Sequence, residues 1–151
     1  MVASLEVLVF SIAGVRYGLP SQDVDGLARM VAITPLPAAP SIVEGAIDMH
    51  GSVVPVLDMR SRFGHAPRPP TLSDRLILAR AGNRRVAVRS DSVSGLVYVE
   101  PDVGALERLG AASTTLIAGV ATLPDGLVLI HDLATFLTEA EAAMLDTALP
   151  R

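Results

Sequence analysis

Cysteine, lysine and tryptophan are all absent from the sequence, and aromatic residues account for only 3% of it. The absence of cysteine excludes disulfides, thiolate nucleophiles and cysteine-based metal sites, and it fits a reducing cytoplasm. With so few aromatic rings, the core has to be built from Val, Leu, Ile, Ala and Met. Half of the residues are hydrophobic, so we expect a folded chain, and an aliphatic core of this kind favours strands and small barrels.

The charged residues argue against two classes of partner. All cationic side chains are arginines, and the formal net charge is −4, which makes nucleic-acid binding a poor expectation. The local cluster Arg60, Arg62, Arg68 and Arg75 is therefore interpreted as a solvated face rather than a phosphate-binding track. No apolar stretch reaches the roughly 18 residues needed to cross a bilayer. The first residues lack the basic region of a signal peptide and include Glu6.

Two parts of the sequence are similar to each other. The segment LEVLVFSIAGVRYGLP matches RLILARAGNRRVAVRS, and the segment after Val43 matches the segment after Ile117. At nearly constant spacing, the corresponding residues include Leu8 and Leu76, Gly26 and Gly95, Val43 and Ile117, and Asp58 and Asp132. A repeat of this length predicts two related β units of about five strands each, at 5–63 and 73–137. The proline-rich connector GHAPRPPTLSD separates them.

The C-terminal segment has a different pattern. Apolar residues recur every three or four positions over 132–149, which predicts an amphipathic helix; they are Leu133, Phe136, Leu137, Ala140 and Met144. Thr138 and Glu141 have the spacing of a capping box, so a second helical segment is expected to begin there after a bend.

Several polar residues could be taken for an active site. Asp48 and His50 are two apart on a predicted strand and would share one face, but we interpret them as a polar edge beside a turn rather than an acid–base pair. Asp58 and Asp132 each precede a short helical pattern and are expected to cap it. The chain has no HExxH, GxxxxGK[ST] or GxSxG motif. We therefore predict no catalytic residue, no metal site and no cofactor.

The stretch GAIDMHGSVVPVLDMRSRFG, residues 45–64, resembles the signature G-[VA]-x-N-[LM]-R-G-x-[VI]-[VI]-P-[VI]-[VIL]-D-[LM]-R of the CheW family. The similarity extends to the opening VLVFSIAGVRYGLP, to SDSVSGLV and to IAGVATLPDGLVLIHDLATFL. The resemblance implies a single, mostly β CheW-like domain over residues 1–151. It would contain two small five-stranded SH3-like β-barrel subdomains, short helices and a C-terminal helix, and it allows strands to be exchanged between the subdomains.

The resemblance also implies a function. CheW proteins are non-catalytic cytoplasmic adaptors that couple methyl-accepting chemoreceptors to the histidine kinase CheA in a chemosensory array. Carried over position by position, the residues implied to face the kinase regulatory domain are Val24, Gly26, His50, Gly51 and Val53. Those implied to face the cytoplasmic tip of the receptor are Arg75, Ala87 and Val93.

The sequence departs from the family pattern at two of these positions. His50 replaces an arginine of the signature, and Gly26 replaces a glutamate that is common on the third strand. We hypothesise that these two charges form an ion pair in typical members and were lost together, since a lone charge at an interface is costly. One alternative is a divergent CheW-like module with a changed partner or self-association. Another is an enzyme on a small β-barrel, which would need a deep polar pocket holding His50 and Asp48.

Overall fold

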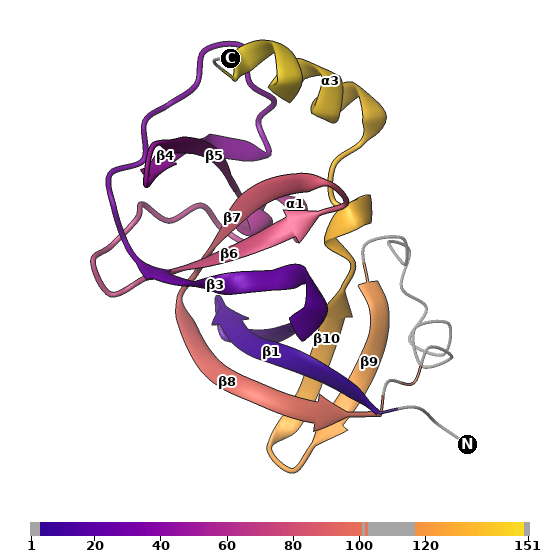
Figure 1. The fold of residues 1–151 in the computed structure, drawn as a ribbon. Helices are drawn as coiled ribbons and strands as arrows, with labels where there is room; N and C mark the ends of the chain where they lie inside the picture. Colours follow the sequence, from indigo (N-terminus) through magenta and orange to yellow (C-terminus); the bar gives the residue numbers. More distant parts are fainter. Residues whose placement is uncertain (1–3, 101, 103–116, 150–151) are drawn as a thin grey trace.

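The computed structural model describes residues 4–100, 102 and 117–149, and its strands form two five-stranded sheets (Figure 1). In hydrogen-bonding order, sheet A consists of β8 (Ser92–Val99), β1 (Leu5–Ile12), β2 (Val15–Pro20), β10 (Gly126–His131) and β9 (Ile117–Leu123). Sheet B consists of β3 (Val24–Arg29), β6 (Arg75–Ala81), β7 (Arg84–Ser90), β5 (Ser52–Leu57) and β4 (Val43–Met49). The mostly β fold with two five-stranded units is confirmed.

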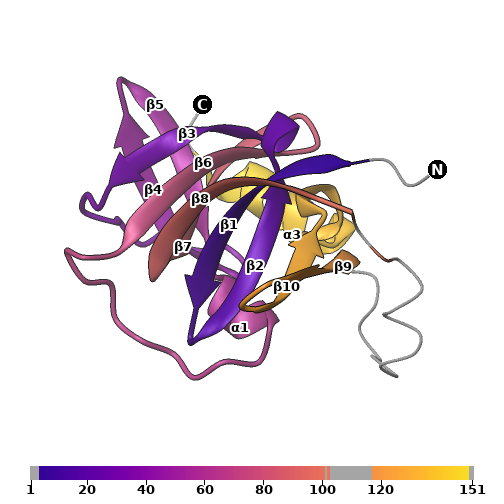
Figure 2. The ribbon, with the colours of Figure 1, turned by 90° about the horizontal axis from the view of Figure 1, so that it is seen from below.

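The two sheets exchange strands in a reciprocal way. Sheet A combines the first hairpin, β1–β2, with β8, β9 and β10 from the second half of the chain, whereas sheet B combines the second hairpin, β6–β7, with β3, β4 and β5 from the first half. Figure 2 shows β1, β2, β10 and β9 following one another across sheet A. The ranges 5–63 and 73–137 are therefore repeats in sequence but not the units in space, and the exchange that the family resemblance allowed is present.

A short connection explains one half of this exchange. Only Asp91 separates β7 from β8, and only the 3-10 helix η1 (Ser21–Asp23) separates β2 from β3. A single residue cannot reverse the chain into a hairpin, which needs at least a two-residue loop. The strand after Asp91 therefore continues out of sheet B and pairs with β1 in sheet A. In the other half of the exchange, β3 follows the 3-10 helix out of sheet A and pairs with β6.

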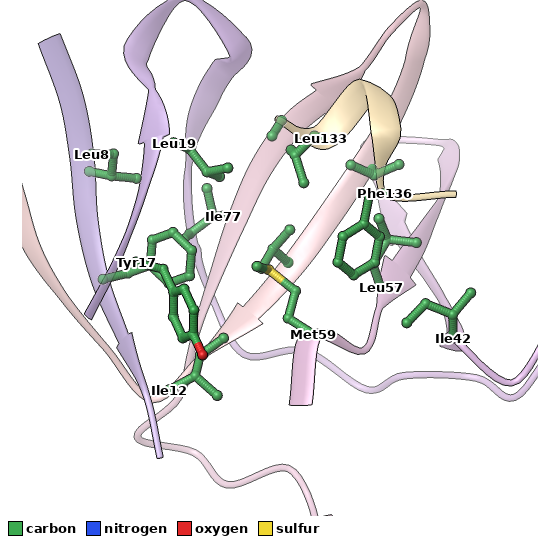
Figure 3. Packing of buried hydrophobic residues seen from close by; sticks show 14 of the residues in the cluster. Leu8, Ile12, Tyr17, Leu19, Ile42, Leu57, Met59, Ile77, Leu133 and Phe136 are labelled. Carbon is green, nitrogen blue, oxygen red and sulfur yellow. The ribbon is translucent and has the colours of Figure 1, made fainter. Parts of the chain in front are cut away.

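The largest hydrophobic cluster lies between the two sheets and takes residues from both (Figure 3). Leu8 and Phe10 of β1 belong to it, whereas Val7 and Val9, on the other face of the same strand, belong to a second cluster inside sheet A. A third cluster fills sheet B. Because β1 is buried on both faces, it reads as a continuous apolar run.

Both aspartate caps are confirmed. The side chain of Asp58 accepts a hydrogen bond from the N–H of Ser61 at the start of α1 (Met59–Arg62). Asp132 accepts one from the N–H of Ala134 at the start of the 3-10 helix η3 (Leu133–Thr135). A side-chain acceptor at this position satisfies a backbone donor that the first helical turn leaves free.

The C-terminal segment forms two pieces rather than one helix over 132–149. After η3, α3 (Glu139–Ala148) begins at a complete capping box between Thr138 and Glu141, as predicted. The bend resets the helical phase, so Leu145 faces the core and Met144 is exposed, although the spacing predicted Met144 on the buried face.

Candidate functional site

The β4–β5 hairpin presents an exposed tip made of His50, Gly51 and Val53. His50 and Gly51 both have positive φ, 55° and 88°, as a two-residue hairpin turn requires. One carboxylate oxygen of Asp48 accepts a hydrogen bond from the N–H of Gly51 at 2.8 Å. The prediction that Asp48 and His50 share a face of one strand is therefore wrong, because His50 lies in the turn and Asp48 holds that turn.

Val24 and Gly26, the other two residues implied to face the kinase, lie half-buried on β3. β3 and β4 are the first and last strands of sheet B, so these residues and the hairpin tip come from opposite ends of the strand order. A methyl group added at Gly26 would meet no atom within 4 Å. The surface beside Gly26 is consequently open enough for a side chain or for a partner.

A groove of about 520 Å³ runs between β3 of sheet B and β8 of sheet A. Arg75 and Val93, two of the three residues implied to face the receptor, line it. Ala87 does not, because it is fully buried on β7 among Leu76 and other residues of the sheet B cluster. The structure therefore brings Arg75 and Val93 together and places Ala87 beneath the surface.

Sequence reasoning missed most of the remaining groove lining, which consists of Leu27, Ala28, Arg29, Ser73, Asp91, Ser92, Ser94 and Gly95. The repeat carried a signal for it, since Leu27 corresponds to Leu96 and Gly26 to Gly95. These equivalent strands, β3 and β8, both have a bulge in their pairing with the neighbouring strand. A bulge twists a strand locally, and both bulges lie at the strands that bound the groove.

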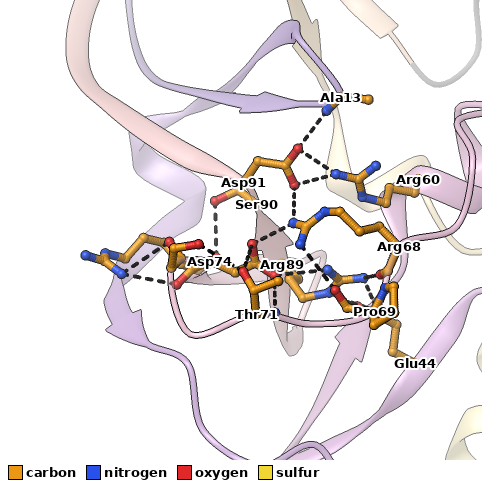
Figure 4. A network of polar contacts seen from close by, with 12 residues as sticks. Ala13, Glu44, Arg60, Arg68, Pro69, Thr71, Asp74, Arg89, Ser90 and Asp91 are labelled. Atoms are coloured by element: carbon orange, nitrogen blue, oxygen red, sulfur yellow. Dashed lines mark hydrogen bonds and ion pairs between the residues drawn. The ribbon is translucent and has the colours of Figure 1, made fainter.

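A network of ion pairs is centred on Asp91 (Figure 4). A terminal nitrogen of Arg60 lies 2.5 Å from each carboxylate oxygen of Asp91, and a terminal nitrogen of Arg68 lies 2.7 Å from one of them. The N–H of Ala13, in the β1–β2 turn, donates at 2.9 Å. Burial alone would raise the pKa of Asp91, but these partners outweigh it and lower the pKa to about 2. The network thus ties sheet A to α1 and to the connector 64–74.

The network continues through Arg89 of β7. Its guanidinium donates to both carboxylate oxygens of Glu44, to Asp74 at 3.1 Å and to the carbonyl of Arg68 at 2.8 Å. Burial would raise the pKa of Asp74, but the N–H of Thr71 together with Arg68 and Arg89 lowers it. Three arginines and three carboxylates thereby neutralise one another in a network that reaches the groove at Asp91: Arg60, Arg68, Arg89, Glu44, Asp74 and Asp91.

The interpretation of the arginine cluster as a solvated face is wrong for three of its four members. Arg60 and Arg68 belong to the ion-pair network. Arg62 pairs with Glu141 of α3 and lies over the ring of Phe136. Only Arg75 is exposed.

The three histidines do not form one site, although His65 and His131 both lie against Tyr17. His50 lies at the hairpin tip, and Nε2 of His65 is 2.6 Å from the hydroxyl of Tyr17. His131 is fully buried beside the rings of Tyr17 and Phe63, and neither of its ring nitrogens has a hydrogen-bond partner. Burial lowers the pKa of His131 to about 3, so this ring is neutral at ordinary pH.

Over residues 4–100, 102 and 117–149, no group of three or more histidine or acidic side chains could hold a metal ion. Within the same residues, no helix is long and apolar enough to cross a membrane.

Comparison with known proteins agrees with this geometry. The sequence profile of the CheW-like domain matches residues 6–141. The chain is 28% identical to the chemotaxis protein CheW of Rhizobium meliloti over 122 residues, which cover 76% of this chain and 79% of that protein. It is 22% identical to CheW of Klebsiella aerogenes over 93% of this chain and 86% of that protein.

A solved structure has the same fold. The crystal structure of the scaffolding protein TtCheW from Thermoanaerobacter tengcongensis superposes with a TM-score of 0.76 at 26% identity, covering 91% of this chain and 95% of that one. The match spans both sheets, since together they occupy most of the described residues. The chain therefore belongs to the family of CheW-like domains, a family of non-catalytic chemotaxis scaffold proteins.

Proposed function

We propose that this scaffold works in the cytoplasm and couples two partners: the regulatory domain of the histidine kinase CheA and the cytoplasmic tip of methyl-accepting chemoreceptors. The kinase domain binds sheet B at the β4–β5 tip and β3, through Val24, Gly26, His50, Gly51 and Val53. The receptor tip binds in the groove, through Arg75 and Val93. Ala87 contributes from below by packing the strand that supports the groove.

The observation that carries this proposal is that the β4–β5 tip and the β8 side of the groove are separate exposed surfaces, while β3 between them contributes Gly26 to the kinase surface and Leu27 to the groove. The hairpin tip belongs to sheet B alone, whereas the groove is bounded by one strand of each sheet. The ion-pair network joins the two sheets through Asp91, which lies at one side of the groove. Such an arrangement suits a protein that holds two partners in a fixed relation rather than one that transforms a substrate.

The test is binding to each partner separately, with one substitution for each surface. Val53→Asp places a charge at the exposed hairpin tip, and Val93→Asp places one in the groove. We expect Val53→Asp to reduce binding of the kinase regulatory domain at least tenfold and to leave receptor-tip binding unchanged. Val93→Asp should have the opposite pattern. Biolayer interferometry with immobilised kinase domain or receptor tip measures both.

Leu127→Asp is the matched control, because Leu127 is half-exposed on β10 and lies outside both surfaces. It should leave both affinities unchanged. Melting curves of all three variants identify any loss that comes from unfolding. If wild-type protein binds neither partner, or if the two surface variants reduce both affinities equally, the assignment of two separate surfaces is wrong.

A second candidate is self-association, and one observation favours it. Leu96 and Tyr98 point outward from β8, an edge strand of sheet A, with 58% and 73% of their surface exposed. Exposed apolar side chains on a sheet edge are typical of a surface that pairs with another protein. Sedimentation of wild type and of Leu96→Ser/Tyr98→Ser distinguishes this candidate, because only self-association through β8 makes the wild type heavier than the variant.

A further inference from the structure

The groove contains a pair of like charges. Arg29 of β3 lies directly opposite Arg75 of β6 in the antiparallel register, and both line the groove. Cross-strand neighbours have their β-carbons roughly 5 Å apart, and like charges at that position destabilise a sheet. Among the described residues neither guanidinium has a carboxylate partner, and Arg75 donates only to the backbone carbonyls of Ser73 and Asp74.

The acidic residues nearby do not offset these two charges. Asp91 lines the groove, but both of its oxygens are occupied by Arg60, Arg68 and the N–H of Ala13. Asp74, which lies between the groove residues Ser73 and Arg75 in the sequence, is buried and forms ion pairs with Arg68 and Arg89. The ion-pair network has equal numbers of positive and negative side chains, so it has no excess negative charge to balance Arg29 and Arg75. The groove is therefore positive on a chain whose net charge is −4.

The remaining lining is suited to a helix. Leu27 and Val93 supply apolar surface from the two strands that bound the groove, and Gly95 has no atom within 4 Å of where a β-carbon would lie. A partner can therefore approach the backbone of β8 closely at this point. Amphipathic helices bind in grooves of this kind through an apolar stripe.

We propose that the groove selects a partner helix carrying carboxylates beside its apolar stripe, and that Arg29 and Arg75 form the clamp that binds them. This inference rests on the groove being the receptor-tip site and specifies the chemistry of the helix it takes. Arginine binds carboxylates through two parallel hydrogen bonds, so the clamp fixes the position of the helix along the groove. Binding also removes the repulsion between the two arginines.

The test uses three stapled helical peptides with the same leucine stripe. One carries glutamates flanking the stripe, and the others carry glutamine or lysine at the same positions. Fluorescence anisotropy measures their affinity for the full chain at low and high salt. We expect the glutamate peptide to bind at least tenfold more tightly than the glutamine peptide, the preference to shrink with salt, and the lysine peptide not to bind.

Substitutions in the protein identify the clamp. Arg29→Gln/Arg75→Gln should abolish the preference for glutamate over glutamine. The matched control is Arg85→Gln, which removes one exposed arginine from the opposite end of the β6–β7 hairpin and should retain the preference. Arg29→Glu creates a favourable cross-strand pair with Arg75, so its melting temperature should stay the same or rise while the glutamate peptide no longer binds. Loss of binding in that variant cannot be attributed to unfolding.

Equal binding of the glutamate and glutamine peptides, or binding of neither, would overturn the inference. So would binding of wild type to anionic lipid vesicles in place of the glutamate peptide. The receptor tip itself separates this inference from the proposed function. If the tip binds and is displaced by Val93→Asp but not by Arg29→Gln/Arg75→Gln, the groove is the receptor site and the clamp is wrong. If the tip does not bind wild type, the proposed function fails, and the peptide series still decides the clamp.

Discussion

Arg60 and Asp91 join the two sheets of this protein at the point where the chain passes from one to the other. Asp91 is the single residue between β7 and β8, and the guanidinium of Arg60, on α1, contacts both of its carboxylate oxygens. Replacing Asp91 by Asn should lower the free energy of unfolding by about 2 kcal/mol. We expect less than the full cost of breaking a buried pair because 29% of the Asp91 side chain is exposed.

Urea unfolding followed by circular dichroism measures this loss. The control is Asp125→Asn, which breaks the pair between Asp125 and Arg16. Since 76% of the Asp125 side chain is exposed, that substitution should barely move the midpoint. Equal shifts for the two variants would show that the Arg60–Asp91 pair contributes no more than a surface contact.

Because His131 is buried, we expect the free energy of unfolding to decrease as the pH is lowered. In the unfolded chain its pKa is about 6.5, whereas burial lowers the folded value to about 3. Below pH 6.5 the unfolded state therefore binds a proton that the folded state does not. The free energy of unfolding should decrease by about 1.4 kcal/mol per pH unit as the pH falls from 6 to 4.5.

Replacing His131 by Phe or Leu should flatten this pH dependence, because neither side chain titrates. Unfolding in urea at half-unit intervals from pH 7.5 to 4.5 measures the slope. Asp91 affects the slope mainly below this window, because its contribution is lost as the pH falls from its unfolded pKa of about 3.8 towards its folded pKa of about 2. If both variants keep the slope of the wild type, another group is responsible for the acid sensitivity.

Substitution by alanine should have opposite effects on stability at Gly45 and at Gly26. A β-carbon at Gly45 would lie 2.3 Å from the carbonyl oxygen of Thr34, and Gly45 has a φ of 157°. Two backbone hydrogen bonds join Thr34 to Ala46 at this point. Gly45→Ala should therefore cost about 3 kcal/mol of stability. Gly26→Ala, with no atom nearby and no positive φ, should stabilise the protein by up to about 1 kcal/mol.

Thermal melts of the two variants at one protein concentration test this contrast. A small effect at Gly45 would mean that the segment around Thr34 moves away without cost. That result would remove the steric reason for a glycine at this position.

The departures from the family signature lead to a prediction about the kinase. If His50 and Gly26 replace an arginine and a glutamate that act together, His50→Arg/Gly26→Glu should bind the kinase regulatory domain at least tenfold more tightly than either single variant. The structure leaves room for a side chain at position 26. Position 50 lies in a turn with positive φ, a conformation that is uncommon for residues other than glycine and more common for His than for most of them.

Isothermal titration of the four proteins with the kinase domain gives the coupling between the two sites. Affinities that simply add would contradict the paired-loss hypothesis. Wild-type protein that already binds as tightly as the double variant would show that the kinase contact does not depend on these charges.

The sequence repeat predicted ten strands in two equivalent sets but not the sheets they form. Equivalence between Leu8 and Leu76 says that two strands have the same environment, and it does not say which strands are their neighbours. The deciding feature was the length of the connection at Asp91, which is too short for a hairpin. Such a signal is present in the sequence but becomes informative only when the ends of β7 and β8 are known to the residue.

The surface positions were predicted unevenly for a physical reason. The hairpin tip at His50 and Gly51 was evident because its turn chemistry is local. Ala87 was implied to be accessible, yet β7 is the central strand of sheet B and is covered on both faces. Asp91, the acidic partner that Arg60 and Arg68 share, was not found because it follows them only after more than twenty residues.

The reciprocal exchange of strands also sets an order of assembly during synthesis. Sheet B is complete once the ribosome has released residue 90, because β7 is the last of its strands along the sequence. Sheet A begins with the first hairpin of the nascent chain and cannot close until β9 and β10 emerge. The hairpin β1–β2 therefore lacks its neighbouring strands, and its apolar side chains stay partly uncovered, while most of the chain is translated. The first hairpin to be synthesised is therefore the last to receive all of its neighbouring strands.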